Sequence, residues 1–345
     1  MRRDFAAPRA LLTGSPVRWI VTGVAGFIGS NLLECLLEGD QIVAGLDDFS
    51  TGSRANLDAV RQAVGEARWT RFRMVEGDLR DPAACRAVCR DGGLVLHQGA
   101  LGSVPRSIAE PFLAHDVNVS GTLQLFLAAR DAGCRRIVYA SSSSVYGDDP
   151  GLPKRESVLG RQLSPYAVTK YTDELYAGVY AKHYGLTISG LRYFNVFGPR
   201  QSPDGPYAAV IPRFLEALDR GEAGVIHGDG ETSRDFCYVA NVVQANLRAA
   251  MASLPEGSHT AFNVACGRAT TLRRLYELLR SAVASRRGTA PPDASYGDFR
   301  AGDIARSLAD IGLAAALLGY APTHQIEEGL VLTTDWFLRD EGAER

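Results

Sequence analysis

The sequence predicts an α/β protein in which a doubly wound parallel sheet is followed by a smaller C-terminal α/β lobe. Two observations carry this prediction. Short β-branched runs alternate with longer helical stretches through the first half of the chain, and this alternation is typical of parallel strands joined by helical crossovers. A glycine-rich turn also follows the first of these runs, at residues 23–29.

The expected elements follow one another closely. Strands are expected at residues 17–22, 41–46, 71–76, 94–97 and 136–140, and helices at 28–38, 83–89 and 117–132. In doubly wound sheets, ligands bind at the carboxyl ends of the strands. Polar side chains that directly follow a strand are therefore candidates for a site.

The composition changes after Phe194, where proline and glycine become frequent. We expect one domain over residues 17–194 and a second lobe over 195–345, with segments around 236–266 returning to the first domain. Residues 261–265 are a candidate for a returning strand. Residues 1–16 form a short N-terminal extension with no role evident from the sequence.

Composition excludes several classes of protein. The 345 residues are 46% apolar and carry a net charge of −2, from 37 basic and 39 acidic residues. Nucleic acid is not an expected partner, because no long basic run is present. No apolar stretch reaches the roughly 18 residues that a membrane span needs. We expect a soluble, cytoplasmic protein without a membrane partner.

The six cysteines form no Cys-x-x-Cys pair and have no histidine cluster beside them. Cys85 and Cys89 are one helical turn apart, which would allow a metal. Small buried side chains on a helix are the favoured interpretation. We predict neither a disulfide nor a metal.

Gly23, Gly26 and Gly29 are spaced for dinucleotide binding between a strand and a helix. The first permits a tight turn, the second lets the backbone approach a pyrophosphate, and the third lets the helix meet the strand. The helix N-terminus at Phe27 and Ile28 would present free N–H groups to the phosphates. The sequence therefore predicts a Rossmann-type site.

Asp47, at the end of the second expected strand, indicates which dinucleotide binds. A carboxylate eighteen residues beyond Gly29 can accept hydrogen bonds from the adenosine ribose and would repel a 2′-phosphate, so NAD is favoured over NADP. Arg54 would favour NADP but is interpreted as a surface residue. Asp78 and Leu79 are candidates for the adenine contact, with a turn-forming aspartate as the alternative for Asp78.

Tyr166 and Lys170 are four residues apart, which on a helix places the phenol and the ammonium on one face. The pKa of a phenol is about 10, and an adjacent cation lowers it. We interpret the pair as a proton acceptor; the alternative is a chance pairing on a solvated helix. Asn118, in the expected helix 117–132, is a candidate for the nicotinamide end of the site.

With these motifs the chain resembles the extended short-chain dehydrogenase/reductase family, and within it the nucleotide-sugar 4-epimerases of the bacterial branch that prefers N-acetylated sugars and serves surface-polysaccharide pathways. The resemblance runs from Thr22 to about Asp335. Gln98-Gly99-Ala100 departs from the family pattern at Gly99, where alanine is more usual. Besides the motifs above, its markers are the segments 46–48, 77–79, 141–147, 191–195, 228–230, 233–236 and 300–303.

The resemblance implies a redox-neutral inversion at C4 of a UDP-sugar through a 4-keto intermediate, with NAD tightly bound because each cycle regenerates it. Tyr166 would accept the proton of the 4-hydroxyl, Ser142 would bridge that hydroxyl to Tyr166, and Lys170 would hold the nicotinamide ribose. For the serine run that holds Ser142, a loop with capping hydroxyls is the alternative. The resemblance also assigns cofactor contacts to Gln98, Ala100, Asn118 and Tyr193.

The UDP-sugar side is likewise implied by the resemblance. Arg234 and Arg300 would bind the diphosphate, with surface ion pairs as the alternative, and Asp303 would bind the uridine ribose. Ser307 would stand beside the C2 substituent of the sugar, where a serine leaves room for an acetamido group. The further contacts are Gly102, Ser103, Ser142, Ser143, Ser144, Asn195, Ala209, Val210, Val225 and His227.

Several alternatives stay open. The absence of a carboxylate at residues 143–145 argues against a 4,6-dehydratase. The interconversion of UDP-GlcNAcA and UDP-GalNAcA is a second candidate, for which Arg106 would bind the uronate, and UDP-glucose is a candidate side substrate. An NAD-sensing regulator is the non-enzyme alternative. The resemblance also implies a homodimer, through a bundle of the Tyr166 helix and the helix at 117–132.

Overall fold

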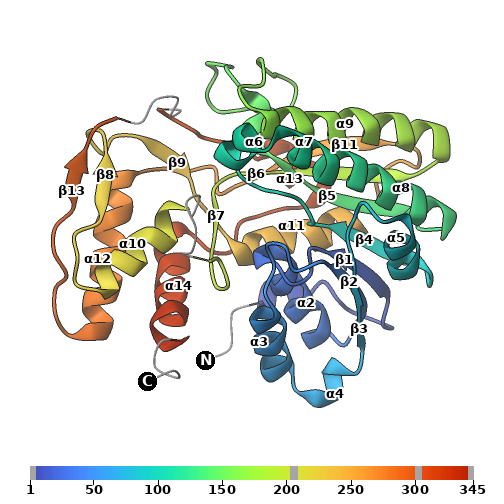
Figure 1. Ribbon diagram of the computed structural model, residues 1–345, viewed down its shortest axis with the longest axis horizontal. Coiled ribbons are helices and arrows are strands. Elements are labelled where there is room, and N and C mark those ends of the chain that lie inside the picture. Colours follow the sequence, from blue (N-terminus) through green and yellow to red (C-terminus); the bar gives the residue numbers. More distant parts are fainter. Residues whose placement is uncertain (1–4, 203–208, 300–304, 341–345) are drawn as a thin grey trace.

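Seven parallel strands form the central sheet, and the predicted doubly wound α/β fold is confirmed (Figure 1). The computed structural model describes residues 5–202, 209–299 and 305–340. The strand order is β11-β6-β5-β4-β1-β2-β3. The strands are β1 (Arg18–Thr22), β2 (Ile42–Asp47), β3 (Phe72–Glu76), β4 (Leu94–His97), β5 (Arg136–Ser142), β6 (Thr187–Tyr193) and β11 (His259–Val264).

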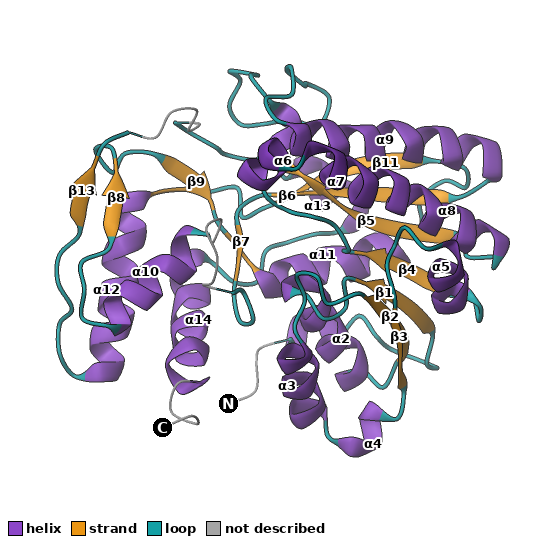
Figure 2. Cartoon of the chain, viewed as in Figure 1, coloured by secondary structure: helices purple, strands orange, loops and turns teal. Residues whose placement is uncertain are grey.

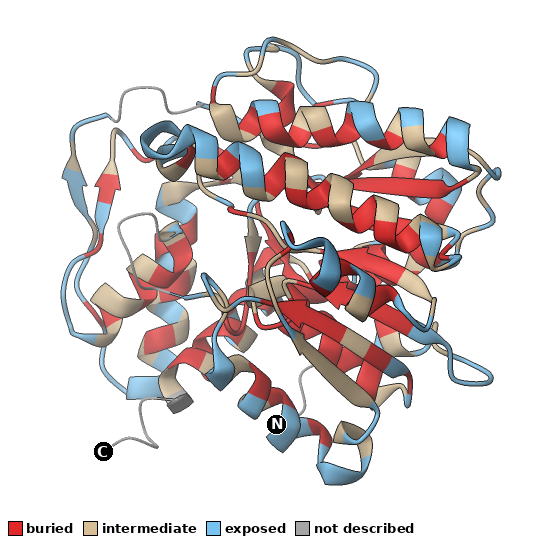
Figure 3. Ribbon diagram, turned by 45° about the vertical axis from the view of Figure 1, so that its right-hand side comes forward, coloured by how far each residue is buried: buried red, intermediate tan, exposed pale blue. Residues whose placement is uncertain are grey.

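The sheet is buried on both faces, because successive strand residues enter different cores. Ile137 and Tyr139 of β5 pack in the core beneath one helical layer, whereas Val138 between them packs in the other. This arrangement explains the continuous apolar strands of a parallel sheet. Figure 3 shows the buried strands between their covering helices.

Each face has its own set of helices (Figure 2). One set comprises α2 (Phe27–Glu38), α3 (Arg54–Val64) and α11 (Val239–Met251), and α2 packs against both others. The opposite set comprises α5 (Pro82–Cys89), α8 (Gly121–Asp131) and α9 (Pro165–Tyr184), with α8 between α5 and α9. Short helices α4 (Glu66–Trp69), α6 (Val104–Ala109) and α7 (Pro111–His115) lie in the connections.

The segment expected to be helical from residue 117 is interrupted at its start. A π-helical turn, η1 (Asp116–Ser120), precedes α8. Asn118 lies in this wider turn, and its carbonyl accepts a hydrogen bond from the Thr122 hydroxyl. Single π-turns within α-helices are frequent at functional sites.

The later part of the chain builds a smaller lobe and also returns to the sheet. β11 pairs with β6 along its whole length, so residues 261–264 lie in a returning strand. Three short strand pairs occur in this part of the chain: β7 (Val196–Phe197) with β10 (Cys237–Tyr238), β8 (Val225–His227) with β13 (Ser295–Gly297), and β9 (Ser233–Asp235) with β12 (Ala269–Thr271). The lobe helices α10 (Val210–Asp219), α12 (Leu272–Arg287) and α14 (Ile326–Asp340) pack against one another, whereas α13 (Gly312–Leu318) packs against β11 and α11.

The N-terminal extension is anchored to the first domain. Phe5 is 2% exposed and belongs to the same core as α2 and α11. It precedes the short helix α1 (Ala6–Arg9), which packs against both helices. Arg9 pairs with Glu38 at the end of α2, at 3.5 Å. Among the described helices, none has the length and apolarity of a membrane span.

Candidate active site

A cavity of about 690 Å³ lies at the carboxyl ends of β1, β2 and β4, where the strand order reverses. This is the position at which doubly wound sheets bind their ligands. The cavity brings together most of the predicted cofactor residues. They are Gly23, Gly26, Phe27, Ile28, Gly29, Asp47, Asp78, Leu79, Gln98 and Ala100.

The glycine turn fits a dinucleotide because it admits no side chain at two of its positions. Gly23 has a φ of +64°, and a Cβ there would lie 2.8 Å from the backbone of Gly99. A Cβ on Gly29 would lie 2.0 Å from the carbonyl oxygen of Gly23. The turn and the start of α2 therefore pack in direct backbone contact, which leaves the helix N-terminus open towards the cavity.

Asp47 is fixed at the end of β2 by backbone donors. Its carboxylate accepts hydrogen bonds from Ala25 N at 2.8 Å and Phe49 N at 2.9 Å, while burial raises its pKa. Arg54, the residue that would favour a 2′-phosphate, pairs with Glu76 at 2.7 Å and stacks over the Phe49 ring. The arrangement suits the ribose hydroxyls of NAD.

Asp78 also lines the cavity, and Arg80 holds its carboxylate at 2.6 Å. The hydrogen bond from Arg80 lowers the pKa of Asp78, so the side chain is an anion at neutral pH. Arg80 in turn reaches Asp116 at 3.1 Å. The adenine candidate is therefore held in place by the segment that carries η1.

Tyr193 and Gln98 act together with a residue that sequence reasoning missed. The Tyr193 hydroxyl donates to Gln98 Oε1 at 2.9 Å and accepts from Asn246 Nδ2 at 2.8 Å. Gln98 Nε2 donates to Asn246 Oδ1 at 3.0 Å. Asn246 comes from α11, more than fifty residues from either partner, and nothing in its local sequence marks it. These three mutual hydrogen bonds hold Gln98 at the cavity wall.

Asn118 supports the cavity from behind and does not line it. Its Oδ1 accepts from Leu101 N at 2.7 Å, and its Nδ2 donates to Leu101 O and Thr169 Oγ1 at 3.2 and 3.1 Å. These bonds use both amide hydrogens, so we find no side-chain donor left for a cofactor. Asn118 instead ties the cavity wall at Leu101 to the residue before Lys170.

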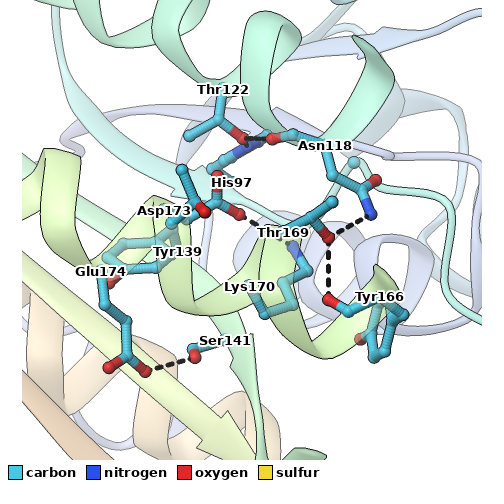
Figure 4. A network of polar contacts seen from close by, with 12 residues as sticks. His97, Asn118, Thr122, Tyr139, Ser141, Tyr166, Thr169, Lys170, Asp173 and Glu174 are labelled. Carbon is cyan, nitrogen blue, oxygen red and sulfur yellow. Dashed lines mark hydrogen bonds and ion pairs between the residues drawn. The ribbon is translucent and has the colours of Figure 1, made fainter. Parts of the chain in front are cut away.

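The start of α9 carries Tyr166 and Lys170 on one side of the helix (Figure 4). The Ser164 hydroxyl caps the helix by accepting from Ala167 N at 3.1 Å, and Pro165 occupies the first turn. Tyr166 N donates to Ser107 Oγ at 3.0 Å, which joins α9 to α6. Lys170 is 2% exposed, whereas Tyr166 is only partly buried.

The serine run begins in β5 and continues into a short 3₁₀ turn, η2 (Ser143–Tyr146). Ser142 is the last strand residue, and its hydroxyl accepts from Ser144 N at 3.1 Å. Ser144 Oγ is buried without a hydrogen-bond partner among the described residues, and Ser143 is partly buried. The Ser142 hydroxyl therefore caps the turn, as the alternative interpretation of the serine run expects, while the Ser144 hydroxyl has no structural partner among the described residues.

A second cavity, of about 560 Å³, lies in the lobe. It is lined by the predicted substrate residues Asn195, Ala209, Val210, Val225, His227 and Arg234. Arg213 on α10 also lines it and was missed by the sequence analysis. Gln201 borders this cavity and the first one, so the two predicted binding regions adjoin.

The remaining predicted residues are only partly described by the structure. Gly102 lines the first cavity, and the Ser103 hydroxyl caps α6 by accepting from Arg106 N. Ser307 N donates to Ser233 O at 3.1 Å, beside Arg234. Arg300 and Asp303 lie outside the described residues.

A buried histidine fixes the strand ends beneath the site. His97 Nδ1 is 2.6 Å from Thr22 Oγ1, and its Nε2 is 2.9 Å from Thr122 Oγ1. The Thr122 hydroxyl donates to the Asn118 carbonyl, so Nε2 carries the hydrogen and Nδ1 accepts. Burial and the nearby Lys170 lower the pKa of His97 to about 3. The ring is therefore neutral.

Comparisons with known proteins agree with this geometry. The family described as the NAD dependent epimerase/dehydratase family matches residues 19–265. A UDP-glucose 4-epimerase of Mycolicibacterium smegmatis is 37% identical over 323 residues, which is 93% of this chain and 98% of that protein. A UDP-glucuronate 4-epimerase of Thermodesulfobacterium geofontis is 32% identical over 92% of this chain and 95% of its own.

Solved structures are equally similar. The UDP-N-acetylglucosamine 4-epimerase of Methanobrevibacter ruminantium, in complex with UDP-N-acetylmuramic acid, has a TM-score of 0.85 and 36% identity and covers 95% of this chain and 100% of its own. The fold and the cavity thus define an NAD-dependent α/β protein. The chain belongs to the NAD dependent epimerase/dehydratase family.

Proposed function

We propose that the protein interconverts UDP-GlcNAc and UDP-GalNAc by reversible epimerisation at C4, through a 4-keto intermediate and with tightly bound NAD. The observation that carries the proposal is the placement of Tyr166 and Lys170 on one side of α9, joined through Thr169 and Asn118 to the wall of the NAD cavity. When bound, NAD supplies the redox chemistry by taking up and returning the hydrogen of C4.

The chain's own residues supply positions and charges. The Tyr166 oxygen accepts the proton of the sugar 4-hydroxyl and later returns it, and the Lys170 ammonium favours the anionic form of that oxygen. Ser142 ends the neighbouring strand and bridges the 4-hydroxyl. In the lobe, Arg213 and Arg234 line a cavity whose positive charges suit a diphosphate.

The N-acetylated substrate is supported by Ser307 and by the similarity to a UDP-N-acetylglucosamine 4-epimerase. UDP-glucose remains a second candidate because the relative from Mycolicibacterium smegmatis is a UDP-glucose 4-epimerase. The uronate candidate is less favoured. Arg106, its predicted contact, pairs at 3.0 Å with Glu110, the residue that follows α6, so its charge is already partly balanced.

A product-resolved incubation tests the proposal. The purified protein is incubated, without added cofactor, with UDP-GlcNAc, UDP-glucose or UDP-GlcNAcA, and the sugar nucleotides are separated by chromatography. We expect UDP-GalNAc to form fastest, and mass spectrometry to find NAD in the purified protein. If another sugar were turned over faster, that sugar would be the substrate in place of UDP-GlcNAc. If no sugar were turned over although NAD is bound, the NAD-sensing regulator would be favoured.

We also propose a homodimer formed through α9. Val168, Leu175 and Val179 are exposed apolar residues of α9, and Phe112 of α7, a helix that packs against α9, is 90% exposed. No large apolar side chain of α8 is exposed to a similar degree, so we add α7 to the proposed interface beside α9 and the predicted helix at 117–132. Val179→Glu should convert a dimer to a monomer in light scattering, whereas Val158→Glu, at a similarly exposed loop valine, should not.

A cytoplasmic location is supported by the cysteines. All six are free thiols, and five of them are buried. A reducing compartment keeps such thiols free. Fractionation of cells that express the protein tests this location.

A further inference from the structure

Two neighbouring carboxylates on α9 are buried, but only one of them has a hydrogen-bond or ion-pair partner for both of its oxygens. Glu174 is 6% exposed and receives Arg192 Nε and Nη2 at 2.9 and 2.7 Å as well as the Ser141 hydroxyl at 2.6 Å. Asp173 is 1% exposed; its Oδ2 lies 3.4 Å from Lys170 Nζ, and its Oδ1 has no partner among the described residues.

Lys170 depends on Asp173 for its counter-charge. Among the described residues, Asp173 is the only carboxylate within ion-pair distance of its ammonium. From β4, His97 faces Lys170 as a neutral ring. From β5, Tyr139 adjoins the carboxylates but hydrogen-bonds to His259. Glu174 faces Asp173 from the same helix and is committed to Arg192.

We propose that Asp173 is a positioning residue for the reaction, a buried counter-ion that holds the Lys170 ammonium and whose own charge sets how strongly that ammonium favours the Tyr166 phenolate. This inference rests on the proposed roles of Tyr166 and Lys170. It adds a third member to the pair, one that touches neither substrate nor cofactor.

The charge of Asp173 changes the electrostatic field that Lys170 exerts at Tyr166. An ionised Asp173 partly cancels the field of Lys170 at Tyr166, whereas a protonated Asp173 leaves that field intact. Burial outweighs the nearby Lys170 and raises the pKa of Asp173 to about 7. The carboxyl group therefore changes its charge near neutral pH, and its unpartnered Oδ1 is held by no donor that would fix the ionised form.

Asp173→Asn tests the inference, because it keeps the shape and removes the charge. Without its counter-ion, Lys170 gives up its proton more readily and, while charged, favours the phenolate more strongly. We expect the alkaline limb of the kcat–pH profile to move by about one pH unit towards acid. The acid limb should move by less, because Asp173 already gains its proton on that side, and KM for the UDP-sugar should change little. A merely structural role would lower kcat equally at all pH values and leave both limbs in place.

A second measurement needs no turnover. The ultraviolet phenolate absorbance of the NAD-loaded protein is titrated with pH, and the Tyr166→Phe difference isolates Tyr166. The midpoint should fall in Asp173→Asn and in Asp173→Ser, and should stay near the parent's in Asp173→Glu and in the exposed control Asp131→Asn. An unmoved midpoint in the neutral variants overturns the inference. This outcome is independent of whether UDP-GlcNAc is the substrate.

Discussion

Arg192 of β6 and Glu174 of α9 form a two-point ion pair, with Nε–Oε1 at 2.9 Å and Nη2–Oε2 at 2.7 Å, and both side chains are buried. The Arg192 side chain also donates to the Tyr146 hydroxyl at 3.1 Å. The pair fastens the helix that carries Tyr166 and Lys170 to the central sheet. The position of the candidate site therefore depends on a contact outside it.

Arg192→Met should destabilise the fold by about 3–5 kcal/mol, because it leaves the Glu174 charge buried without its partner. Urea unfolding measures the loss. Arg61→Met is the matched control, since Arg61 makes the same two-point contact with Glu66 at an exposed site. There solvent screens the charges, and little change is expected. Equal losses in both variants would contradict the argument.

Tyr166→Phe should lower kcat by a factor of about 10² to 10⁴, because the general base is removed. The hydroxyl of Tyr166 forms no hydrogen bond within the described structure; the backbone of the residue makes its contacts. The variant should therefore keep its fold and its bound NAD, as circular dichroism and mass spectrometry can show. Turnover at the parental rate would refute the role of Tyr166.

Ser307→Tyr should abolish turnover of UDP-GlcNAc and spare UDP-glucose, because the larger side chain would occupy the space proposed for the acetamido group. Steady-state kinetics on both sugars measures the split. Ser307→Ala is the control that keeps the space open. Equal loss on both sugars would remove Ser307 from the specificity argument.

The stability of the protein at acid pH should depend on His97. Its pKa is about 3 in the fold and about 6.5 when unfolded. The unfolded chain alone binds this proton between those values, so this contribution to stability falls as the pH drops from 6.5 towards 3. The pKa values of Asp173 and Asp235 are raised, to about 7 and about 6, by burial. Because the folded protein binds these two protons more readily than the unfolded chain, their contribution to stability rises as the pH falls, opposite to that of His97.

A comparison of variants separates His97 from the two carboxyl groups. Between pH 7 and pH 5, His97→Gln should lose about 2 kcal/mol less unfolding free energy than the parent protein. Urea unfolding at the two pH values measures this difference, and it does not depend on the variant's stability at pH 7. An identical pH dependence in both proteins would mean that His97 is not kept neutral by the fold.

Phe5→Ala should cost about 3 kcal/mol, because it empties a site in the main core. Thermal or urea unfolding measures the cost, and Phe299→Ala, at a residue 71% exposed, is the control. A neutral Phe5→Ala variant would show that the extension is dispensable for stability.

Local patterns in the sequence predicted the sheet and the cofactor end of the site. The glycine turn, Asp47 and the Tyr166/Lys170 spacing each depend on residues close together in the chain, so their geometry follows from strand, turn and helix periods. The interruption of the 117–132 helix by η1 was not predicted. It depends on bonds from Asn118 to Leu101 and Thr169, which no local pattern reveals.

The sequence alone determined the class of fold, the dinucleotide site and the pair that carries the proposed proton transfer, because each follows from short-range spacing. Only the tertiary structure decided what surrounds that pair. Asp173 and Glu174 are adjacent in the sequence, but the fold gives them different partners. Arg192 of β6 pairs with Glu174, and the buried Asp173 is left as the counter-ion of Lys170. Burial strengthens charge interactions that water would screen, and burial is a property of the folded chain.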